Sequence, residues 1–446
     1  MNKEKGAVFL SLSYFLFTFG YIVSRGFYHV GELAIILSVT LILFVFYLKP
    51  QILDKLNLPG DQKSLSFILS IILIINVALV GAHLGDASQT NWRIYSAANR
   101  ILASLAFFFS LSYFLKKTAD FLLKIRLPTL ICLAFLIRIF AIISAPNPTI
   151  DVFYILRDGP KEILAGRNPY QMSYPSPYGV YIPSILFVYG PLTPFLFLPS
   201  VVLFNDPRYT LVLVDLLSTF LLYKIAKKLI LDKIYWQPLI LIFLFHPLFP
   251  FMTEQAWLEP VMTLFLLSAV YLLTKYPQKI WSGVFLGAIL AIKSVYLLPL
   301  LTLLKNRKAN IAQYSTTILI PLILSLPFLL ADPKLFLERT QVYVSDPTRI
   351  QSNLAPTNIS LSIAAVILKY TGYVLPTAVI ALAGLVTSII VIAKGPKTPP
   401  FALISTFLVF TVLFMFGPFV FLHYFAFLGN ILLLSTLLFL GQKHKI

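Results

Sequence analysis

The sequence predicts an all-α polytopic membrane protein, a bundle of about 12 to 14 membrane-spanning helices. Of its 446 residues, 59% are hydrophobic and only 12% are charged, whereas soluble domains carry about 25% charged residues. Most apolar runs approach the ~20 residues that a helix needs to cross a bilayer. The composition leaves no room for a large aqueous domain, so we expect a multi-pass protein of a cell or ER-type membrane.

Twelve apolar runs are expected to span the membrane, in chain order. The first follows a short basic start that mimics a signal peptide, but no small-residue cleavage site follows, so we expect a retained helix. Four runs lie in residues 1–127, an expected accessory module, and eight lie in residues 128–446, the expected main transmembrane domain. The runs are 7–24, 30–48, 65–82, 101–115, 128–145, 208–226, 236–251, 258–274, 313–330, 373–393, 400–418 and 421–440.

Residues 183–203 and 281–304 do not fit a regular spanning helix. The first segment contains four prolines, which interrupt helical hydrogen bonding, and the second contains Pro299 and a lysine at mid-run, Lys293. In the topology that we prefer, 183–203 lies along the membrane interface, and 281–304 enters the membrane and returns as two short half-spans. In the alternative topology, both segments cross the membrane completely.

The distribution of basic residues favours the first topology. It places most of the 35 basic residues in cytoplasmic loops, as the positive-inside rule requires, whereas the alternative moves six lysines between 224 and 279 outside. Both topologies place the two termini in the cytoplasm and Asp151 outside. Membrane orientation thus explains the net charge of +18, and we expect the lipid bilayer, and no nucleic acid, as a partner.

A long polar loop, about residues 146–207, separates the fifth and sixth predicted spans. It carries six charges between Asp151 and Arg167, and because these contribute nothing to anchoring, we expect chemistry or recognition there. Asp151 is a candidate catalytic residue, since a carboxylate at this position can act as general base toward an attacking hydroxyl. The alternative is a solvated aspartate, or a cap for a helix that begins near Val152.

The loop continues with Gly166-Arg167-Asn168-Pro169-Tyr170, whose composition is typical of a turn. The functional interpretation makes Arg167 a phosphate clamp, because the guanidinium fork matches phosphate oxygens. Asn168 and Tyr170 are then candidate substrate-binding residues beside it.

Two acids lie five residues apart at the tip of a predicted hairpin. Glu254 and Glu259 flank Trp257, in a position where carboxylates close to lipid are costly. Either they bind substrate, or they lie in a hydrated hairpin tip at the membrane surface, with Trp257 at the interface. The sequence does not rank one acid above the other.

Three further positions place cationic or ionisable groups within or at the ends of apolar spans. Lys293 is costly unless it reaches an anion or snorkels to the surface. His423, beside Tyr424 at the start of the last span, either binds a phosphate with its neighbour or satisfies a helix end. Arg138 either snorkels or pairs with a buried group such as Asp215.

Common nucleotide and metal motifs are missing from the sequence. It contains no phosphate-binding P-loop, no Gly-x-Gly-x-x-Gly motif, and no His-Glu-x-x-His or paired-cysteine metal motif. We expect no cofactor, and a divalent metal has no support in the sequence. An outward-facing enzyme has no ATP or nucleotide sugar to use, so its energy must come from an activated, lipid-borne donor.

The polar loop resembles the first outer loop of the GT-C superfamily of polytopic glycosyltransferases. The motifs that carry the resemblance are Asp151-Val152-Phe153, Leu164–Tyr170 and Tyr189-Gly190-Pro191-Leu192. They are most similar to motifs of polyprenyl-phosphate-mannose-dependent mannosyltransferases, including the catalytic subunit of the first GPI mannosyltransferase and its bacterial relatives. Weaker matches follow in the same order within about residues 128–440: Val214–Ser218, the acidic tip after His246-Pro247, Ala291–Ser294 and His423–Phe425.

The resemblance implies a GT-C-like bundle whose outer catalytic loop contains interfacial helices. It implies inverting transfer of a hexose, with mannose leading by analogy, from a polyprenyl-phosphate donor to a glycolipid or glycan acceptor on the extracytoplasmic face. It makes Asp151 the base and directs Lys293 and His423 toward the lipid phosphate.

The sequence departs from this family pattern in two ways. Thr149 stands where relatives of the GPI type usually have the first acid of an Asp-x-Asp pair, which puts a metal-binding pair there in doubt. Four extra helices also precede the loop, and these accessory helices bind either a membrane partner or a different acceptor.

Two other classes of protein were weighed against a glycosyltransferase. A transporter or flippase of lipid-linked sugars is expected to carry charged residues along an inner cavity formed by several helices. Here the charge within helices is limited to about Arg138, Asp215 and Lys293. A scaffolding protein leaves the Asp151 loop without a role, so an enzyme is favoured, with the flippase as the alternative.

Overall fold

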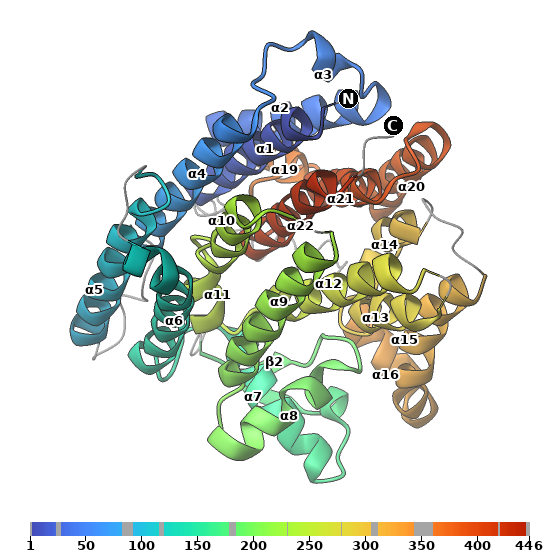
Figure 1. Cartoon of the computed structure of the whole chain (residues 1–446). Helices are drawn as coiled ribbons and strands as arrows, with labels where there is room; N and C mark the ends of the chain where they lie inside the picture. Colours follow the sequence, from blue (N-terminus) through green and yellow to red (C-terminus); the bar gives the residue numbers. More distant parts are fainter. Residues whose placement is uncertain are drawn as a thin grey trace.

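The computed structural model is a bundle of α-helices, in which the start of α1 and the end of α22 lie at the same end (Figure 1). The structure describes residues 2–23, 28–82, 92–115, 120–177, 184–229, 231–277, 279–304, 311–342, 360–417 and 420–442. Within these ranges, nine helices are long and apolar enough to cross a membrane. The prediction of an all-α polytopic membrane protein is confirmed.

Most of the predicted spans correspond to single helices. The nine long apolar helices are α1 (Lys3–Ile22), α2 (Val30–Leu48), α4 (Gln62–Ala82), α6 (Asp120–Ser144), α9 (Arg208–Lys228), α15 (Ile311–Ala331), α20 (Thr377–Lys394), α21 (Pro399–Phe416) and α22 (Leu422–Leu440). The other three predicted spans fall on α5 (Trp92–Leu111), on α10 (Lys233–Leu244) with α11 (Phe249–Glu254), and on α12 (Glu259–Lys275).

Shorter elements connect these helices. The short helices are α3 (Ile52–Lys55), α7 (Asp151–Leu164), α8 (Thr193–Phe204), α13 (Trp281–Leu290), α14 (Leu297–Leu304), α16 (Pro333–Leu337) and α19 (Ile363–Thr371). The described residues also include two 3₁₀ turns, η1 (Pro169–Gln171) and η3 (Ser294–Tyr296), and one π-helical turn, η4 (Glu338–Val342). Strands β1 (Ser173–Pro175) and β2 (Ser184–Leu186) pair antiparallel.

The prediction of one continuous helix over 236–251 is wrong. α10 ends at Leu244 and α11 begins only at Phe249. Pro247 lies in the gap, and because proline lacks an N–H it cannot continue the helical hydrogen-bond ladder. The break leaves His246 between the two helices, where its side chain is fully buried.

The N-terminal helices pack against the C-terminal ones. α1 lies along α22, α2 along α21, and α4 along α10. At the end of the bundle that holds both termini, Gly6 of α1 lies against the ring of Phe439 in α22. One hydrophobic core, with members from Ala7 to Leu440, extends through residues 1–127 and 128–446.

Residues 281–304 enter the bundle and return, as the sequence predicts. Gly283 of α13 packs on Thr316 of α15, and one turn further along both helices Gly287 packs on Ile320. The two helices therefore run parallel. α14 then runs back along α21 and ends beside the last turn of α12. Since α13 and α15 begin at the same level, the two short helices form a re-entrant hairpin whose tip is the break between them.

The polar loop forms a compact layer at the end of the bundle opposite the termini, where α7, α8 and β2 gather (Figure 1). α8 has 12 residues, a length of about 18 Å at 1.5 Å per residue, which is too short to cross a hydrocarbon core of about 30 Å. It packs on α7. The interfacial position of residues 183–203 itself stays a prediction.

Arg138 is paired inside the bundle and does not snorkel. Its Nε lies 2.6 Å from Oδ2 of Asp215, and both side chains are 1% exposed. The remaining guanidinium nitrogens donate to the carbonyl oxygens of Ala134 and Leu244. Because an unpaired buried charge is strongly destabilising, these bonds make Arg138 a structural tie between α6, α9 and α10.

Candidate functional site

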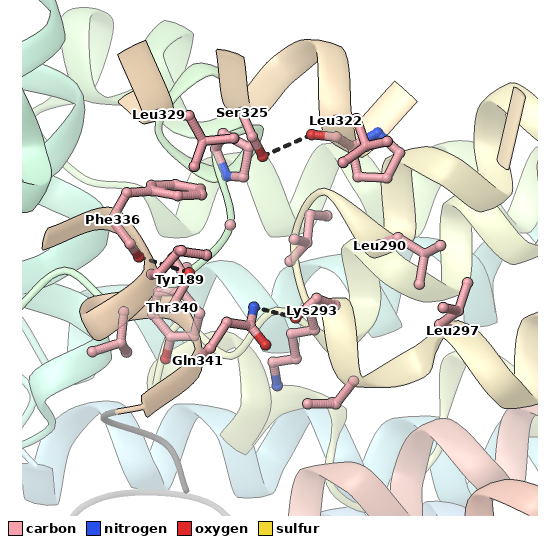
Figure 2. A pocket seen from close by; sticks show the side chains of 18 of the residues that line it. Tyr189, Leu290, Lys293, Leu297, Leu322, Ser325, Leu329, Phe336, Thr340 and Gln341 are labelled. Atoms are coloured by element: carbon pink, nitrogen blue, oxygen red, sulfur yellow. Dashed lines mark hydrogen bonds between the residues drawn. The ribbon is translucent and has the colours of Figure 1, made fainter. Parts of the chain in front are cut away.

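A cavity of about 470 Å³ opens at the tip of the re-entrant hairpin. Its volume lies in the range of small-molecule sites. Figure 2 shows Lys293 and Gln341 at one end and Leu322, Ser325 and Leu329 of α15 at the other. Its lining is mostly apolar, and among the described residues that form it Lys293 is the one cation. The cavity therefore combines a long apolar wall with a single charged end.

Lys293 reaches an anion, which was one of the two alternatives for this residue. It follows the end of α13, in the tip of the hairpin, and its backbone is extended. Its Nζ lies 2.6 Å from Oε1 of Glu259 and 4.3 Å from the ring centre of Tyr424. The lysine is 12% exposed and the glutamate 1%, so this is a largely buried ion pair.

Glu259 joins a second ionisable group to the same cluster. Its Oε1 lies 3.7 Å from Nε2 of His423, whose ring packs on Trp257 at 4.4 Å. Within the described part of the chain, Oε2 of Glu259 and Nδ1 of His423 are buried without a hydrogen-bond partner. Unpartnered buried polar atoms are uncommon in folded proteins, so the cluster retains hydrogen-bonding capacity for a further group.

The structure separates the roles of the two acids that the sequence could not rank. Glu259 contacts Lys293, which lines the cavity, and His423; neither Glu259 nor His423 is itself among the lining residues. Glu254 is also buried, but its carboxylate accepts a hydrogen bond from the side chain of Gln255 at 3.0 Å. Glu259 is therefore the acid of the cavity cluster.

Residues 188–191 line one side of the cavity. The N–H of Gly190 donates to the carbonyl of Ile292 at 2.9 Å, and the N–H of Leu192 donates to that of Ala291 at 3.1 Å. A Cβ on Gly190 would lie 2.2 Å from the carbonyl oxygen of Ala291. Only glycine permits this approach, so Gly190 ties the polar loop to the hairpin tip.

Gly190→Ala is expected to separate the polar loop from the hairpin. The added methyl meets backbone atoms that cannot move aside, and overpacking of this kind costs about 1–3 kcal/mol. We expect a lower melting temperature in detergent and weaker binding of any ligand that occupies the cavity. Gly31→Ala is the matched control, because a Cβ there has only ordinary contacts of 3.5 Å or more; equal losses in both variants would contradict the role of Gly190.

Arg167, Asn168 and Tyr170 lie in the polar loop and not among the cavity-lining residues. The Arg167 side chain is 56% exposed and pairs with Glu162. Asn168 accepts a hydrogen bond from the N–H of Tyr170 at 3.0 Å and caps the η1 turn.

Tyr170 shapes the cavity indirectly. Its ring is fully buried among Phe187, Phe328 and Phe336, and its hydroxyl donates to the carbonyl of Tyr189 at 2.8 Å. Phe336 and Tyr189 both line the cavity, so Tyr170 holds two of its walls together.

Asp151 is the first residue of α7, with Ile150 in the capping position. Its Oδ1 accepts a hydrogen bond from the N–H of Val152 at 2.9 Å. The start of a helix favours a negative charge through the helix dipole, which suits a carboxylate that must be ionised to accept a proton. Asp151 is half-buried and is not among the residues that line the cavity.

Arg208 connects the start of α7 to the acidic hairpin tip. Its guanidinium lies 4.9 Å from the ring centre of Phe153, two residues after Asp151. It also donates to the carbonyl oxygens of Ala145 at 2.6 Å and Glu254 at 3.4 Å. The sequence analysis missed this residue, because an arginine at the start of an apolar span is common at a membrane surface and carries no further signal.

Three further charged side chains of α7 form one ion cluster, in which a single carboxylate lies between two cations. Asp158 contacts Arg157 at 2.8 Å and Lys161 at 3.0 Å. Burial raises the pKa of the Asp158 carboxyl, but hydrogen bonds and charges from Arg157 and Lys161 outweigh burial and leave this pKa below its ordinary value. These three side chains form a local ion cluster that stabilises α7.

A second set of polar groups at the charged end of the cavity was also missed. Thr340 and Gln341 lie on η4, and Gln341 donates to the hydroxyl of Ser294 at 2.8 Å (Figure 2). The sequence predicts no element between the spans 313–330 and 373–393. A π-helical turn has no distinctive composition, so no sequence signal could have found them.

Comparisons of the chain with protein-family models, with curated proteins and with solved structures found no match. Within the described ranges, no group of three or more His, Cys, Asp or Glu side chains is placed to hold a metal ion. The cavity and its charged end are therefore the main basis for assigning a function.

Proposed function

We propose that the protein is an inverting glycosyltransferase that moves a hexose, with mannose as the leading candidate, from a polyprenyl-phosphate donor to a lipid-linked or glycan acceptor. The observation that carries the proposal is Lys293, which is the one cation among the described residues that line an apolar cavity. An amphiphile with one phosphate and a long apolar chain complements such a site in both charge and polarity.

The lipid tail has a route into the cavity along α15. Ile318 and Leu322 of this helix line the cavity, and their side chains are 43% and 52% exposed. Only 17% of the spanning window of α15 is buried, so in a bilayer this helix borders lipid. An isoprenoid chain can enter at this wall while its phosphate approaches Lys293.

In the proposed reaction, Asp151 accepts the proton of an acceptor hydroxyl as that oxygen attacks the anomeric carbon of the donor. The bond between the anomeric carbon and the phosphate oxygen breaks, and its electron pair leaves with the polyprenyl phosphate. Lys293 and His423 stabilise the negative charge on this leaving group. Attack on the face opposite the leaving group inverts the anomeric configuration.

We place the catalytic end outside the cytoplasm. The last turns of α9 and α12 carry Lys227, Lys228 and Lys275, and these turns lie at the end of the bundle that also holds the start of α1. Lysines concentrate on the cytoplasmic side of membrane proteins. The Asp151 loop, at the opposite end, then faces outward.

The proposal is tested with purified protein in sealed liposomes that contain total membrane lipid extract. Radiolabelled polyprenyl-phosphate-mannose and polyprenyl-phosphate-glucose are supplied separately, and protein-free liposomes serve as the control. A new labelled product with one donor supports the transferase and names the sugar. Movement of chemically unchanged donor across the liposome membrane, without a product, would overturn the proposal in favour of a flippase.

A further inference from the structure

Tyr21 is buried near the end of α1, between two segments that carry residues of the candidate site. Its hydroxyl lies 2.7 Å from Nε2 of His246, the residue at the break between α10 and α11. Its ring stacks on Phe425 of α22, with ring centres 5.6 Å apart and planes 17° apart. One side chain of an N-terminal helix therefore contacts both segments.

The hydrogen bond to His246 has a defined direction. The N–H of Leu248 donates to Nδ1 of His246 at 3.3 Å, so Nδ1 acts as an acceptor and Nε2 carries the proton that is donated to Tyr21. Replacing the tyrosine by phenylalanine removes the acceptor and leaves this N–H without its partner. A buried polar group that loses its partner is costly, so the break between α10 and α11 depends on the tyrosine.

Both segments meet again at His423, which faces Glu259, the partner of Lys293. Trp257 follows α11, and its ring packs on His423 at 4.4 Å. His423 lies two residues before Phe425, at the start of α22, and faces Glu259. A shift of either segment therefore changes the contact between Trp257 and His423.

A second layer of polar contacts fixes α1 against the same break. The hydroxyl of Tyr14, two turns before Tyr21, accepts a hydrogen bond from Asn76 of α4 at 3.1 Å. Asn76 also donates to the carbonyl of Ile242 in α10 at 3.5 Å, and the Tyr14 ring meets the His246 ring edge-on at 6.5 Å. Two side chains of α1, Tyr14 and Tyr21, thus contact the histidine, and Asn76 of α4 connects Tyr14 to α10.

We propose that Tyr21 is a positioning residue, which sets the Trp257–His423 contact beside Glu259 and Lys293 by holding His246 and Phe425 in register. Helices α1 and α4 then contribute to the geometry of the catalytic unit, in addition to any role in binding a partner. The effect on turnover rests on the proposed function, whereas the effect on Trp257 does not.

The first measurement needs no activity. Trp92, Trp236 and Trp281 are replaced by phenylalanine in the full-length chain, so that Trp257 alone emits, and Tyr21→Phe is added to this background. We expect a shift in the emission maximum of Trp257 and stronger quenching by acrylamide. The matched control is Tyr47→Phe, which loses a buried hydrogen bond of the same 2.7 Å length, to the carbonyl of Val391, between α2 and α20.

The second measurement uses the transfer assay, normalised to folded protein by size-exclusion chromatography. Misplacing reacting groups by a fraction of an ångström lowers turnover, so Tyr21→Phe should reduce kcat by about tenfold and leave the donor KM within about twofold. Tyr47→Phe should leave both constants unchanged.

The outcomes separate the two proposals. An unchanged Trp257 emission in Tyr21→Phe, or an equal change in Tyr47→Phe, would overturn the positioning role. A shifted emission with wild-type kcat would also overturn it, because the contact would then not affect the reaction. A shifted emission in a protein whose wild type makes no product supports the positioning contact and rejects the transferase.

Discussion

Asp151→Asn is expected to abolish hexose transfer while donor binding stays close to that of the wild type. The substitution keeps the size and hydrogen-bonding capacity of the side chain but removes its ability to accept a proton. General base catalysis contributes about 10²–10⁴-fold to rate, so kcat should fall by that factor with little change in the donor KM. Initial rates with labelled donor in liposomes measure both constants.

Asp158→Asn is the matched control for this substitution. Asp158 lies on the same helix and, like Asp151, outside the cavity lining, but its carboxylate is held in ion pairs with Arg157 and Lys161. We expect a small loss of stability and nearly normal turnover. If Asp151→Asn retains most of its turnover, or if the two variants lose equal amounts, Asp151 is not the base.

Lys293→Ala is expected to weaken donor binding by about 10- to 100-fold. Hydrogen bonds to charged groups contribute about 1.5–3 kcal/mol, and each 1.4 kcal/mol corresponds to a factor of about ten in affinity. The KM for the donor should rise, and polyprenyl phosphate should compete more weakly. Equilibrium binding of radiolabelled polyprenyl phosphate to the detergent-solubilised protein measures this directly.

The substitution also leaves Glu259 buried without its cation, and breaking a buried pair costs about 3–5 kcal/mol of stability. A double variant, Lys293→Met with Glu259→Gln, removes both charges and keeps side chains of similar volume, so it separates folding from binding. A folded double variant that still binds polyprenyl phosphate with wild-type affinity would show that Lys293 does not hold the phosphate. Lys161→Ala, on the surface of α7, controls for loss of a lysine elsewhere.

Several structural features were predicted from local sequence patterns, and one such prediction was wrong. The re-entrant hairpin at 281–304 was predicted because Lys293 and Pro299 interrupt an apolar run and because the alternative moves lysines outside. The pairing of Arg138 with Asp215 was one of two alternatives, and it was named because a buried arginine needs an anion. The continuous span over 236–251 was wrong because hydropathy averages across Pro247 and does not register a break in the helix.

The candidate site depends on contacts between distant segments, which local sequence motifs do not predict. Arg167, Asn168 and Tyr170 stand in one motif with Asp151 nearby, yet the structure turns Arg167 outward and uses Tyr170 to hold cavity walls. Gly190 and Tyr21 had no predicted roles. Both act through close approach to a distant segment, which leaves no periodic or compositional signal.

The sequence by itself determined the membrane class, the positions of most helices and the hairpin that enters and returns. These follow from the length and polarity of each run. In a bilayer, each spanning segment must form its backbone hydrogen bonds within itself, and its apolar length must match the thickness of the hydrocarbon core. Tertiary structure alone decided that Glu259, and not Glu254, pairs with Lys293, and that α1 contacts both His246 and Phe425. Such pairs join residues far apart in the chain, and only side-chain packing between helices selects among the many pairings that the same apolar pattern allows.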